Sequence, residues 1–340
     1  MIDEKEFLRR LGKNQKSAKY KVAIAVTCYN QENYIGTALD SLLSQKTNFP
    51  FLIVVGDDCS IDNSRRILKE YEQKYPIKIK VIYHSKNKGL FANRKEIFKL
   101  LDSEYIAFCD GDDYWIDNDC LQRKVDFLEK NKQYIGYQTA CNIQRGNEIT
   151  KVSDLAERDA FFDFTKENAL RNDYLGQVGG FFFRNIYKCM QTGEFEKYTS
   201  YQVDDSGKLP IFTGVLAPVY RQDKKVTFIY RWLDDSMERE LSKKNRCKDL
   251  FLSHLMYVDM IKDFFGTFHM QIDDQLMVLI VNSFITAVKS TFTKSGKENW
   301  GGQFLFLYNY GYFSKRQIRQ AICIYIKKKI LEKLGWRNSR

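Results

Sequence analysis

The first hundred residues alternate between short apolar runs and stretches whose apolar side chains recur every three or four positions. Short continuous apolar runs are typical of buried strands, and the longer spacing is typical of helices. This order of strand and helix predicts a doubly wound α/β layer around a mostly parallel sheet. The expected strands are 21–27, 51–55, 79–83 and 105–109, and the expected helices are 33–45, 62 or 63 to 75, and 90–101.

Polar side chains follow three of these strands at the point where each strand ends. They are Tyr29 and Asn30, then Asp57 and Asp58, and then Asp110, Asp112 and Asp113. In a parallel sheet these loops share one edge, and ligands of open α/β sheets bind outside the carboxyl ends of the strands. Crowded carboxylates repel one another unless a cation relieves them, and a hard divalent ion shared with phosphates suits such ligands. The alternative from the residues alone is a solvated Asp-Gly turn.

The second half of the chain is less regular. Strands are expected at 134–143, 179–184 and 226–231, whereas 154–169 receives no assignment. From residue 238 onward the pattern is helical, with expected helices at 250–265, 273–289 and 315–334. We therefore expect an N-terminal arm (1–20), an α/β domain (21–237, divided at 145/146) and a C-terminal helical extension (238–340).

Composition narrows the function classes. The net charge of +11 permits an anionic partner without choosing one. The eight cysteines show no Cys-x-x-Cys pair and the three histidines no ligand spacing, which argues against a zinc site and a triad hydrolase. A nucleic-acid-binding protein is disfavoured because no basic-aromatic motif is present. The chain also lacks the glycine fingerprints of dinucleotide folds and P-loops.

Two further features bear on location. The first residues lack the apolar run of a signal peptide, and scattered cysteines fit a reducing cytosol. The most apolar window, 276–288, is shorter than the roughly 20 residues of a membrane span. We therefore expect a cytoplasmic protein. The inner face of the cytoplasmic membrane is one place where it could act.

Four ordered motifs resemble glycosyltransferase family 2. They are Val26–Asn30, Val55–Asp62, Asn87–Leu90 with Asn93 and Arg94, and Cys109–Asp113 with Trp115. The resemblance implies a GT-A fold with a Rossmann-like sheet flanked by helices, a nucleoside-diphosphate-sugar donor, and Mn²⁺ or Mg²⁺ as cofactor. Cys59 stands where the family usually has glycine, so a differently shaped turn is expected there.

The resemblance also implies roles for individual residues. Asp58 would contact the nucleotide base, and Asp110 would contact the ribose or base. Asp112 would bind the metal, together with Asp110. The other expected nucleotide contacts are Thr27, Tyr29, Asn30, Asp57, Arg94 and Gly111. Asp113, Trp115 and Arg231 would contact phosphate or acceptor.

The acceptor half matches the family more loosely. Asp205, or less readily Asp204, would supply the catalytic base, although Ser206, Gly207 and Lys208 interrupt the usual spacing before Leu209-Pro210. A helix N-cap is the structural alternative for this aspartate. Leu233 stands where a metal-binding histidine is common, and Arg231 could face phosphate or pair with Asp234 or Asp235.

The resulting hypothesis is an inverting glycosyltransferase that builds surface polysaccharide, such as a capsule or lipopolysaccharide, from a UDP-sugar and a glycan or lipid-linked glycan. A non-catalytic nucleotide-sugar-binding member of the same fold is the alternative. The basic, amphipathic helix 315–334 could lie on an anionic membrane or dock on the protein.

Overall fold

The computed structural model describes residues 2–15, 17–151, 162–170, 173–202 and 205–233, together with 256, 257, 259, 260, 263 and 264. The chain divides into two compact units. The first holds the described residues up to Leu233, apart from Leu170, together with Phe264. The predicted helices 273–289 and 315–334 lie outside the described residues, whereas the described residues of 250–265 are helical.

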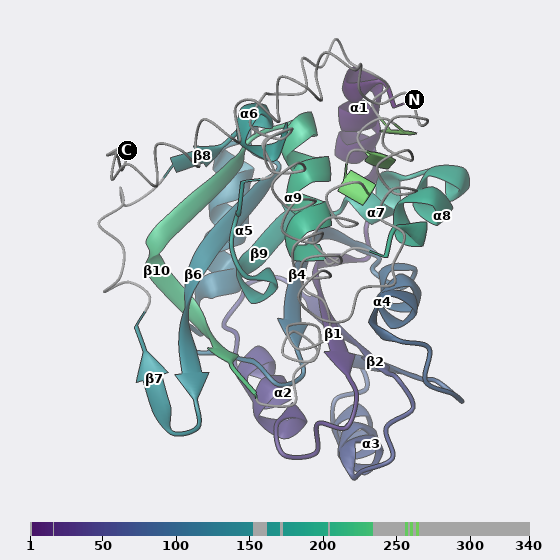
Figure 1. Cartoon of the computed structure of the whole chain (residues 1–340), viewed down its shortest axis with the longest axis vertical. Helices are drawn as coiled ribbons and strands as arrows, with labels where there is room; N and C mark the ends of the chain where they lie inside the picture. Colours follow the sequence, from purple (N-terminus) through teal and green to yellow (C-terminus); the bar gives the residue numbers. More distant parts are fainter. Residues whose placement is uncertain are drawn as a thin grey trace, which may run out of the picture. The chain divides into compact units, whose positions relative to one another are not determined.

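A single mixed sheet organises the first unit, in the order β3-β2-β1-β4-β9-β6-β10-β5 (Figure 1). Its first four strands are all parallel: β1 (Tyr20–Cys28), β2 (Phe51–Asp57), β3 (Ile79–Tyr83) and β4 (Ser103–Asp110). The predicted α/β layer and its four strands are therefore confirmed, with each strand within three residues of its expected bounds at either end.

The other half of the sheet mixes directions. Strand β9 (Phe181–Arg184) runs antiparallel to both of its neighbours, β4 and β6 (Gly136–Arg145). Strand β10 (Val219–Arg231) is parallel to β6 and antiparallel to β5 (Tyr114–Trp115) and β8 (Phe162–Phe164). The short strand β7 (Glu148–Thr150) pairs with β6. The antiparallel β9 brings the residues before Phe181 to the carboxyl end of β4.

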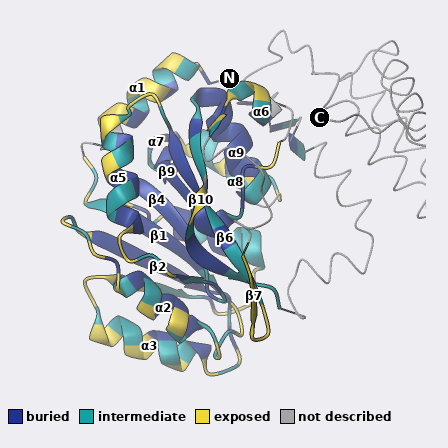
Figure 2. Ribbon diagram, turned by 90° about the vertical axis from the view of Figure 1, so that its left-hand side faces the viewer, coloured by how far each residue is buried: buried dark blue, intermediate teal, exposed yellow. Residues whose placement is uncertain are grey.

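Helices cover both faces of the sheet, so its strands are buried (Figure 2). On one face, leucines of α2 (Ile35–Leu43), α3 (Ser64–Lys74) and α5 (Cys120–Lys130) pack against Val22, Ile24 and Val26. Alternate residues of a strand point to opposite faces. On the other face, Phe98 of α4 (Leu90–Phe98) therefore meets Phe108 of β4, which in turn meets Phe181.

The expected N-terminal arm contains a packed helix. In α1 (Glu4–Gln15) the side chains of Phe7 and Leu11 are buried, and Phe7 makes an edge-to-face contact with Phe212. Arg10 forms an ion pair with Glu194, with an Nη1–Oε2 distance of 2.9 Å. Because α1 has an apolar face, the core of the domain can hold this helix in place.

Residues 205–210 are helical, which agrees with the helix start that the sequence offered as the alternative for Asp205. Helix α9 (Asp205–Leu216) begins at Asp205 and includes Pro210. The remaining helices are α6 (Lys166–Leu170), the 3₁₀ turn η2 (Val178–Gly180), α7 (Ile186–Cys189) and α8 (Thr192–Ser200). Helix α9 lies on the face opposite α5 (Figure 1).

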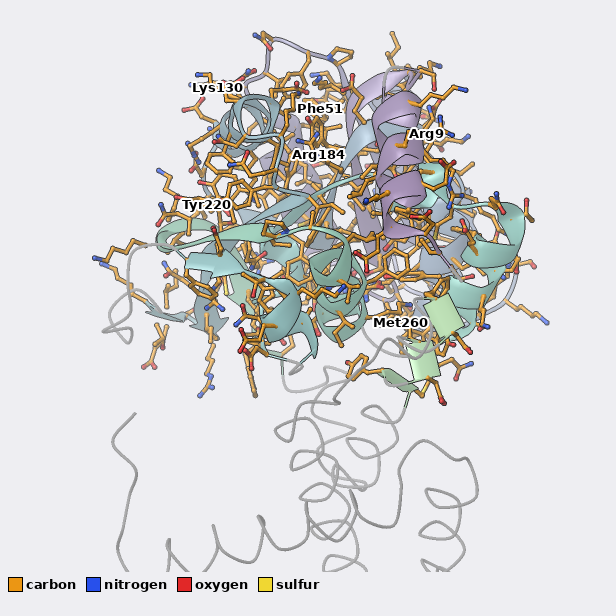
Figure 3. All side chains as sticks on the ribbon, turned by 90° about the horizontal axis from the view of Figure 1, so that it is seen from above. Arg9, Phe51, Lys130, Arg184, Tyr220 and Met260 are labelled. Atoms are coloured by element: carbon orange, nitrogen blue, oxygen red, sulfur yellow. The ribbon has the colours of Figure 1, made fainter. Side chains whose placement is uncertain are left out.

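Charged side chains follow this layering. Arg9 extends outward from α1, whereas Arg184 lies among the side chains of the interior (Figure 3). The guanidinium of Arg184 is satisfied there, because it donates to the carbonyls of Tyr134 and Leu128 at 3.0 and 2.8 Å. Among the described residues, no helix is long and apolar enough to cross a membrane.

Candidate active site

Asp110 lies where the sheet reverses its strand order, at the carboxyl ends of β1 and β4. Thr27 is its register partner in β1, and the Thr27 hydroxyl donates to Asp110 Oδ1 at 2.6 Å. The N–H of Gly111 donates to the Thr27 carbonyl at 2.9 Å. A Cβ on Gly111 would lie 2.7 Å from that carbonyl oxygen, so the close approach requires glycine. Such a switch point is where open α/β sheets bind ligands.

The next two carboxylates have different surroundings. Asp113 is 3% exposed and its Oδ1 accepts the N–H of Arg231 at 2.9 Å. Burial, together with the charges of Asp112 and Asp110, raises the pKa of Asp113 well above its usual range. Asp112 is half-buried, and its backbone carbonyl accepts a hydrogen bond from Arg231 Nη1 at 2.6 Å. Asp113 therefore anchors the turn, and Asp112 is the more accessible of the pair.

Arg231 joins the end of β10 to this turn. Its guanidinium carbon lies 4.4 Å from the ring centroid of Tyr114 and 5.2 Å from that of Tyr34. These cation–π contacts hold a positive charge beside the carboxylates. The alternative partners Asp234 and Asp235 lie outside the described residues.

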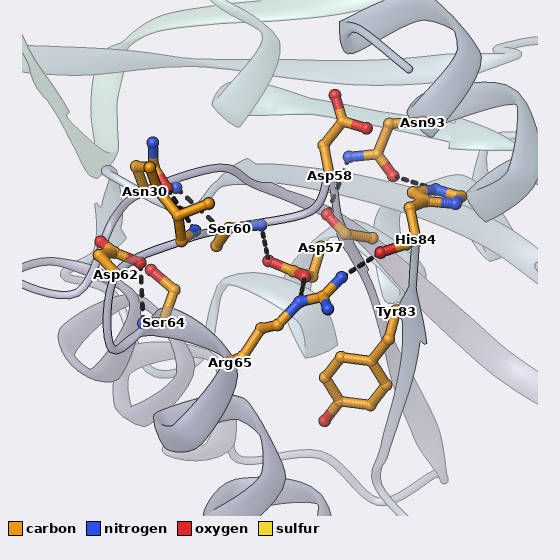
Figure 4. A network of polar contacts seen from close by, with 12 residues as sticks. Asn30, Asp57, Asp58, Ser60, Asp62, Ser64, Arg65, Tyr83, His84 and Asn93 are labelled. Atoms are coloured by element: carbon orange, nitrogen blue, oxygen red, sulfur yellow. Dashed lines mark hydrogen bonds and ion pairs between the residues drawn. The ribbon is translucent and has the colours of Figure 1, made fainter. Parts of the chain in front are cut away.

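Asp57 and Asp58 at the end of β2 form a polar network with the loop after β3 (Figure 4). Asp57 is fully buried and pairs with Arg65, with an Oδ2–Nε distance of 2.5 Å. Asp58 accepts the N–H groups of Lys88 and Gly89, at 2.7 and 2.8 Å. Asp57 and Asp58, which the sequence predicts as nucleotide contacts, thus also hold together the loops at the edge of the site.

Asn93 and His84 extend this network into the helix that follows. Asn93 donates to the Gly56 carbonyl at 2.8 Å, and its Oδ1 lies 3.1 Å from His84 Nε2 (Figure 4). Both side chains are buried. Helix α4 is thereby fixed against β2, and this position directs Arg94 toward Asp110.

The loops after β1 and β2 are joined by hydrogen bonds. Asn30 and Cys59 both have positive φ, 51° and 64°. The N–H of Asn30 donates to the Ser60 hydroxyl at 3.0 Å, and Asn30 Oδ1 accepts the N–H of Ile61 at 2.9 Å. Tyr29 stands beside this pair with 46% of its surface exposed. A tyrosine ring at this edge is available to a flat ligand group.

Arg94 connects the two halves of the site. It is 5% exposed, and its Nη2 lies 3.1 Å from Asp110 Oδ1. Its Nη1 lies 3.2 Å from Oδ2 of Asp205, which is 1% exposed at the start of α9. The described geometry thus assigns Arg94 to two carboxylates, one from each half.

The remaining expected site residues have other positions. Trp115 is 3% exposed and belongs to the core cluster, and its backbone N–H donates to the Ser41 hydroxyl at 3.0 Å. Asp204 lies outside the described residues.

The donor set suits a hard divalent ion shared with a ligand. Among the described residues, no group of three or more His, Cys, Asp or Glu side chains could hold a metal ion. The side chain of Asp110 is 34% exposed and Asp112 is half-buried, so both residues are accessible from solvent. Mg²⁺ is commonly bound by one or two carboxylates, with water and substrate phosphates as its other ligands. The residues present fit such an ion.

Two residues of the network were not expected from the sequence. Arg65, the second residue of α3, pairs with Asp57. Lys208, buried at i+3 from Asp205, lies 3.5 Å from Asp205 Oδ1. The i+3 spacing on a helix was the available signal for Lys208. No sequence signal pointed to Arg65, because its pairing with Asp57 depends on the fold.

The comparisons with known proteins agree with this geometry. Residues 23–190 match the model of the family described as glycosyl transferase family 2. A Mycobacterium tuberculosis protein described as uncharacterized is 38% identical over 112 residues, which are 33% of this chain and 32% of that protein. The chain therefore spans about a third of that relative's length.

A second relative carries a functional description. The putative teichuronic acid biosynthesis glycosyltransferase TuaG of Bacillus subtilis is 30% identical over 158 residues, which are 46% of this chain and 59% of TuaG.

A solved structure shares the fold over most of the chain. Residues 1–349 of Staphylococcus aureus TarS, in complex with UDP, superpose with a TM-score of 0.61 at 16% identity, covering 94% of this chain and 93% of that one. Residues 23–190 of this chain are therefore similar to glycosyltransferase family 2, and the described domain has the predicted GT-A fold.

Proposed function

We propose that the protein transfers a sugar from a nucleoside-diphosphate sugar to a glycan or lipid-linked glycan in bacterial surface polysaccharide biosynthesis, with inversion at the anomeric carbon. The observation that carries the proposal is the joined set Thr27, Asp110, Arg94 and Asp205 at the switch point of the sheet. In this set the Arg94 guanidinium contacts both Asp110, the carboxylate proposed to face the nucleotide, and Asp205, the proposed base.

The names of similar proteins support the substrate class. TarS is described in complex with UDP and with UDP-GlcNAc, which makes UDP-sugars the first donors to test. TuaG is described with teichuronic acid biosynthesis, and GgaB of Bacillus subtilis with minor teichoic acid biosynthesis. Both descriptions concern cell-surface polymers, so we assign the acceptor to that class.

The chemistry follows from the residues in the site. An acceptor hydroxyl oxygen bonds to the anomeric carbon as the bond from that carbon to the diphosphate oxygen breaks. Asp205 takes the hydroxyl proton, and a positioned base contributes about 10²–10⁴-fold to such a step. Asp110 and Asp112 would hold Mn²⁺ or Mg²⁺, which neutralises charge on the leaving diphosphate. Arg231 adds a fixed positive charge next to this turn.

Location and membrane contact complete the proposal. We place the enzyme in the cytoplasm at the inner face of the membrane, where a lipid-linked acceptor would be presented. The basic helix 315–334, which lies outside the described residues, would supply the contact with anionic lipid.

Calorimetry with a panel of nucleotide sugars tests the donor side. We expect one UDP-sugar to bind with Mn²⁺ and to lose most of its affinity in EDTA and in Asp112→Ala. Asp126→Ala is the matched control, because Asp126 is an exposed carboxylate on α5. Equal binding with Mn²⁺ and EDTA would remove the metal from the proposal, and no binding of any donor would overturn it.

Turnover then separates an enzyme from a binding protein of the same fold. Release of UDP from the donor that binds measures transfer to water in the absence of the acceptor. We expect Asp205→Asn to keep donor binding and to lose UDP release by about 10²-fold or more, as for removal of a base. Unchanged release in Asp205→Asn would favour the non-catalytic alternative.

A further inference from the structure

A buried lysine lies one helical turn after the candidate base. The tripeptide Ser206-Gly207-Lys208, which interrupts the family's usual spacing, forms part of the first turn of α9. The Lys208 side chain is only 5% exposed. An ammonium group taken out of water costs several kcal/mol unless charge and hydrogen bonds compensate it. Its surroundings in this domain must therefore supply that compensation.

Three groups surround the Lys208 ammonium. Its Nζ lies 3.5 Å from Asp205 Oδ1 and donates to the Tyr201 carbonyl at 3.4 Å. It also lies 4.7 Å from the ring centroid of Tyr198. A lysine held by a ring face and a carbonyl has few other positions, so its charge remains near Asp205.

The charges form a chain of alternating sign. Asp110 contacts Arg94, Arg94 contacts Asp205, and Asp205 contacts Lys208. Among the described residues these are two carboxylates and two cations. Without Lys208, one guanidinium would serve both carboxylates, and the carboxylate of Asp205 is only 2% exposed.

The buried surroundings of Asp205 make a second cation beside it important. Tyr187 of α7 and Tyr198 of α8 are buried, and the charges of Asp205 and Arg94 both influence Tyr187. A carboxylate buried in such surroundings is held in one orientation only by its ion pairs and hydrogen bonds. A base must be held within hydrogen-bond reach of the proton that it takes.

We infer that Lys208 is a positioning residue that holds the Asp205 carboxylate in place while Arg94 serves Asp110 and the donor. The inference rests on the proposed function, in which Asp205 is the base. Lys208 itself touches neither donor nor acceptor in this assignment. It acts through the Asp205 carboxylate.

Three lysine variants test the assignment. Lys208→Met removes the charge and keeps a long side chain, and Lys208→Arg keeps the charge. Lys95→Met is the matched control, because Lys95 forms an ion pair with Glu196 between α4 and α8 away from Asp205. The readouts are the Kd of UDP with Mn²⁺ by calorimetry and the rate of UDP release from UDP-GlcNAc, or from whichever panel donor binds.

We expect Lys208→Met to bind UDP as the wild type does and to release it about 10- to 100-fold more slowly, a part of the contribution of a positioned base. Lys208→Arg should recover most of this loss, and Lys95→Met should lose nothing. Equal rates in wild type and Lys208→Met would overturn the inference, as would equal losses in the Met and Arg variants.

A double-mutant cycle keeps the test independent of turnover. Asp205→Asn, Lys208→Met and the double variant are compared by urea unfolding, and a coupling between the two sites is expected. Additive shifts of the unfolding midpoints would mean that the two side chains do not interact, which overturns the inference. Coupling with normal UDP release in Asp205→Asn would instead reject Asp205 as the base, and with it the role of Lys208.

Discussion

Individual residues of this domain carry charge in places where water does not reach them. Lys124 on α5 is 1% exposed, and its Nζ donates to the Gly180 carbonyl at 3.1 Å and lies 5.8 Å from the Trp115 ring centroid. Burial lowers the pKa of Lys124 from 10.5 to about 8. This lysine lies beneath the sheet that holds the site, so its protonation affects the stability of that sheet.

Lys124 should make stability depend on pH. Between pH 8 and 10.5 the folded state has released a proton that the unfolded state still holds, so the free energy of unfolding rises with pH in that window. The full effect is at most about 3.5 kcal/mol, from about 1.4 kcal/mol per pKa unit. Lys124→Met should flatten this rise in urea unfolding at pH 7.5, 9 and 10. Lys130→Met, at an exposed position of the same helix, should not. Parallel pH curves for all three proteins would contradict the prediction.

Single residues also set the limit of what the sequence could predict. The four motifs predicted where Thr27, Asp58, Arg94 and Asp110 would gather, because parallel strands end at one edge. Cys59 replaces a usual glycine, and its φ of 64° means that the left-handed turn is kept although the residue is not glycine. That Arg94 would contact Asp205 was not predictable, because 111 positions separate them and the contact depends on how α9 packs.

At the scale of elements, the turn after β4 depends on close backbone approach. Gly111 lies against the Thr27 carbonyl of β1, so the end of β4 is held directly by its neighbour. Gly193 in α8 is a useful contrast, because a Cβ there would meet nothing within 4 Å. The two glycines therefore differ in what a methyl group would displace.

Substituting each glycine by alanine tests this difference. Gly111→Ala places a Cβ 2.7 Å from a backbone oxygen that cannot move aside, and overpacking of this kind costs about 1–3 kcal/mol. We expect a lower melting temperature and weaker Mn²⁺-dependent donor binding. Gly193→Ala should instead stabilise the protein by up to about 1 kcal/mol through helix propensity. The idea fails if Gly111→Ala binds donor and melts as the wild type does.

Helix and strand positions were predictable to different degrees. The first four strands and three helices follow regular apolar periods, and the structure has them close to the expected bounds. The sequence offered a helix start only as the alternative for Asp205, because glycine and proline interrupt the pattern after it, whereas tertiary packing holds α9 from Asp205 onward. Propensity is a weak guide where burial decides.

At the scale of the whole domain, stability should be distributed unevenly over the sheet. Strand β1 pairs with β2 and β4 along most of its length and is buried between two helical layers. Among the described strands, β7 pairs with β6 alone, and all three of its residues are exposed. Local opening should therefore cost far less free energy at β7 than at β1.

Amide hydrogen exchange read by mass spectrometry measures this difference. Peptides covering Val22–Val26 should exchange slowest, at rates limited by global unfolding. A peptide covering Glu148–Thr150 should exchange within the shortest labelling time. Comparable protection of the two peptides would contradict this ordering.

The parallel half of the sheet has a consequence for how such a protein can change over time. Apart from Asp205, Lys208 and Arg231, the site residues described above lie between Thr27 and Trp115. On the proposed function, substitutions in the later half would alter acceptor choice and leave that stretch unchanged, provided that those three side chains keep their contacts. Acceptor specificity would then change by mutation of one half of the gene, while donor chemistry is inherited unchanged.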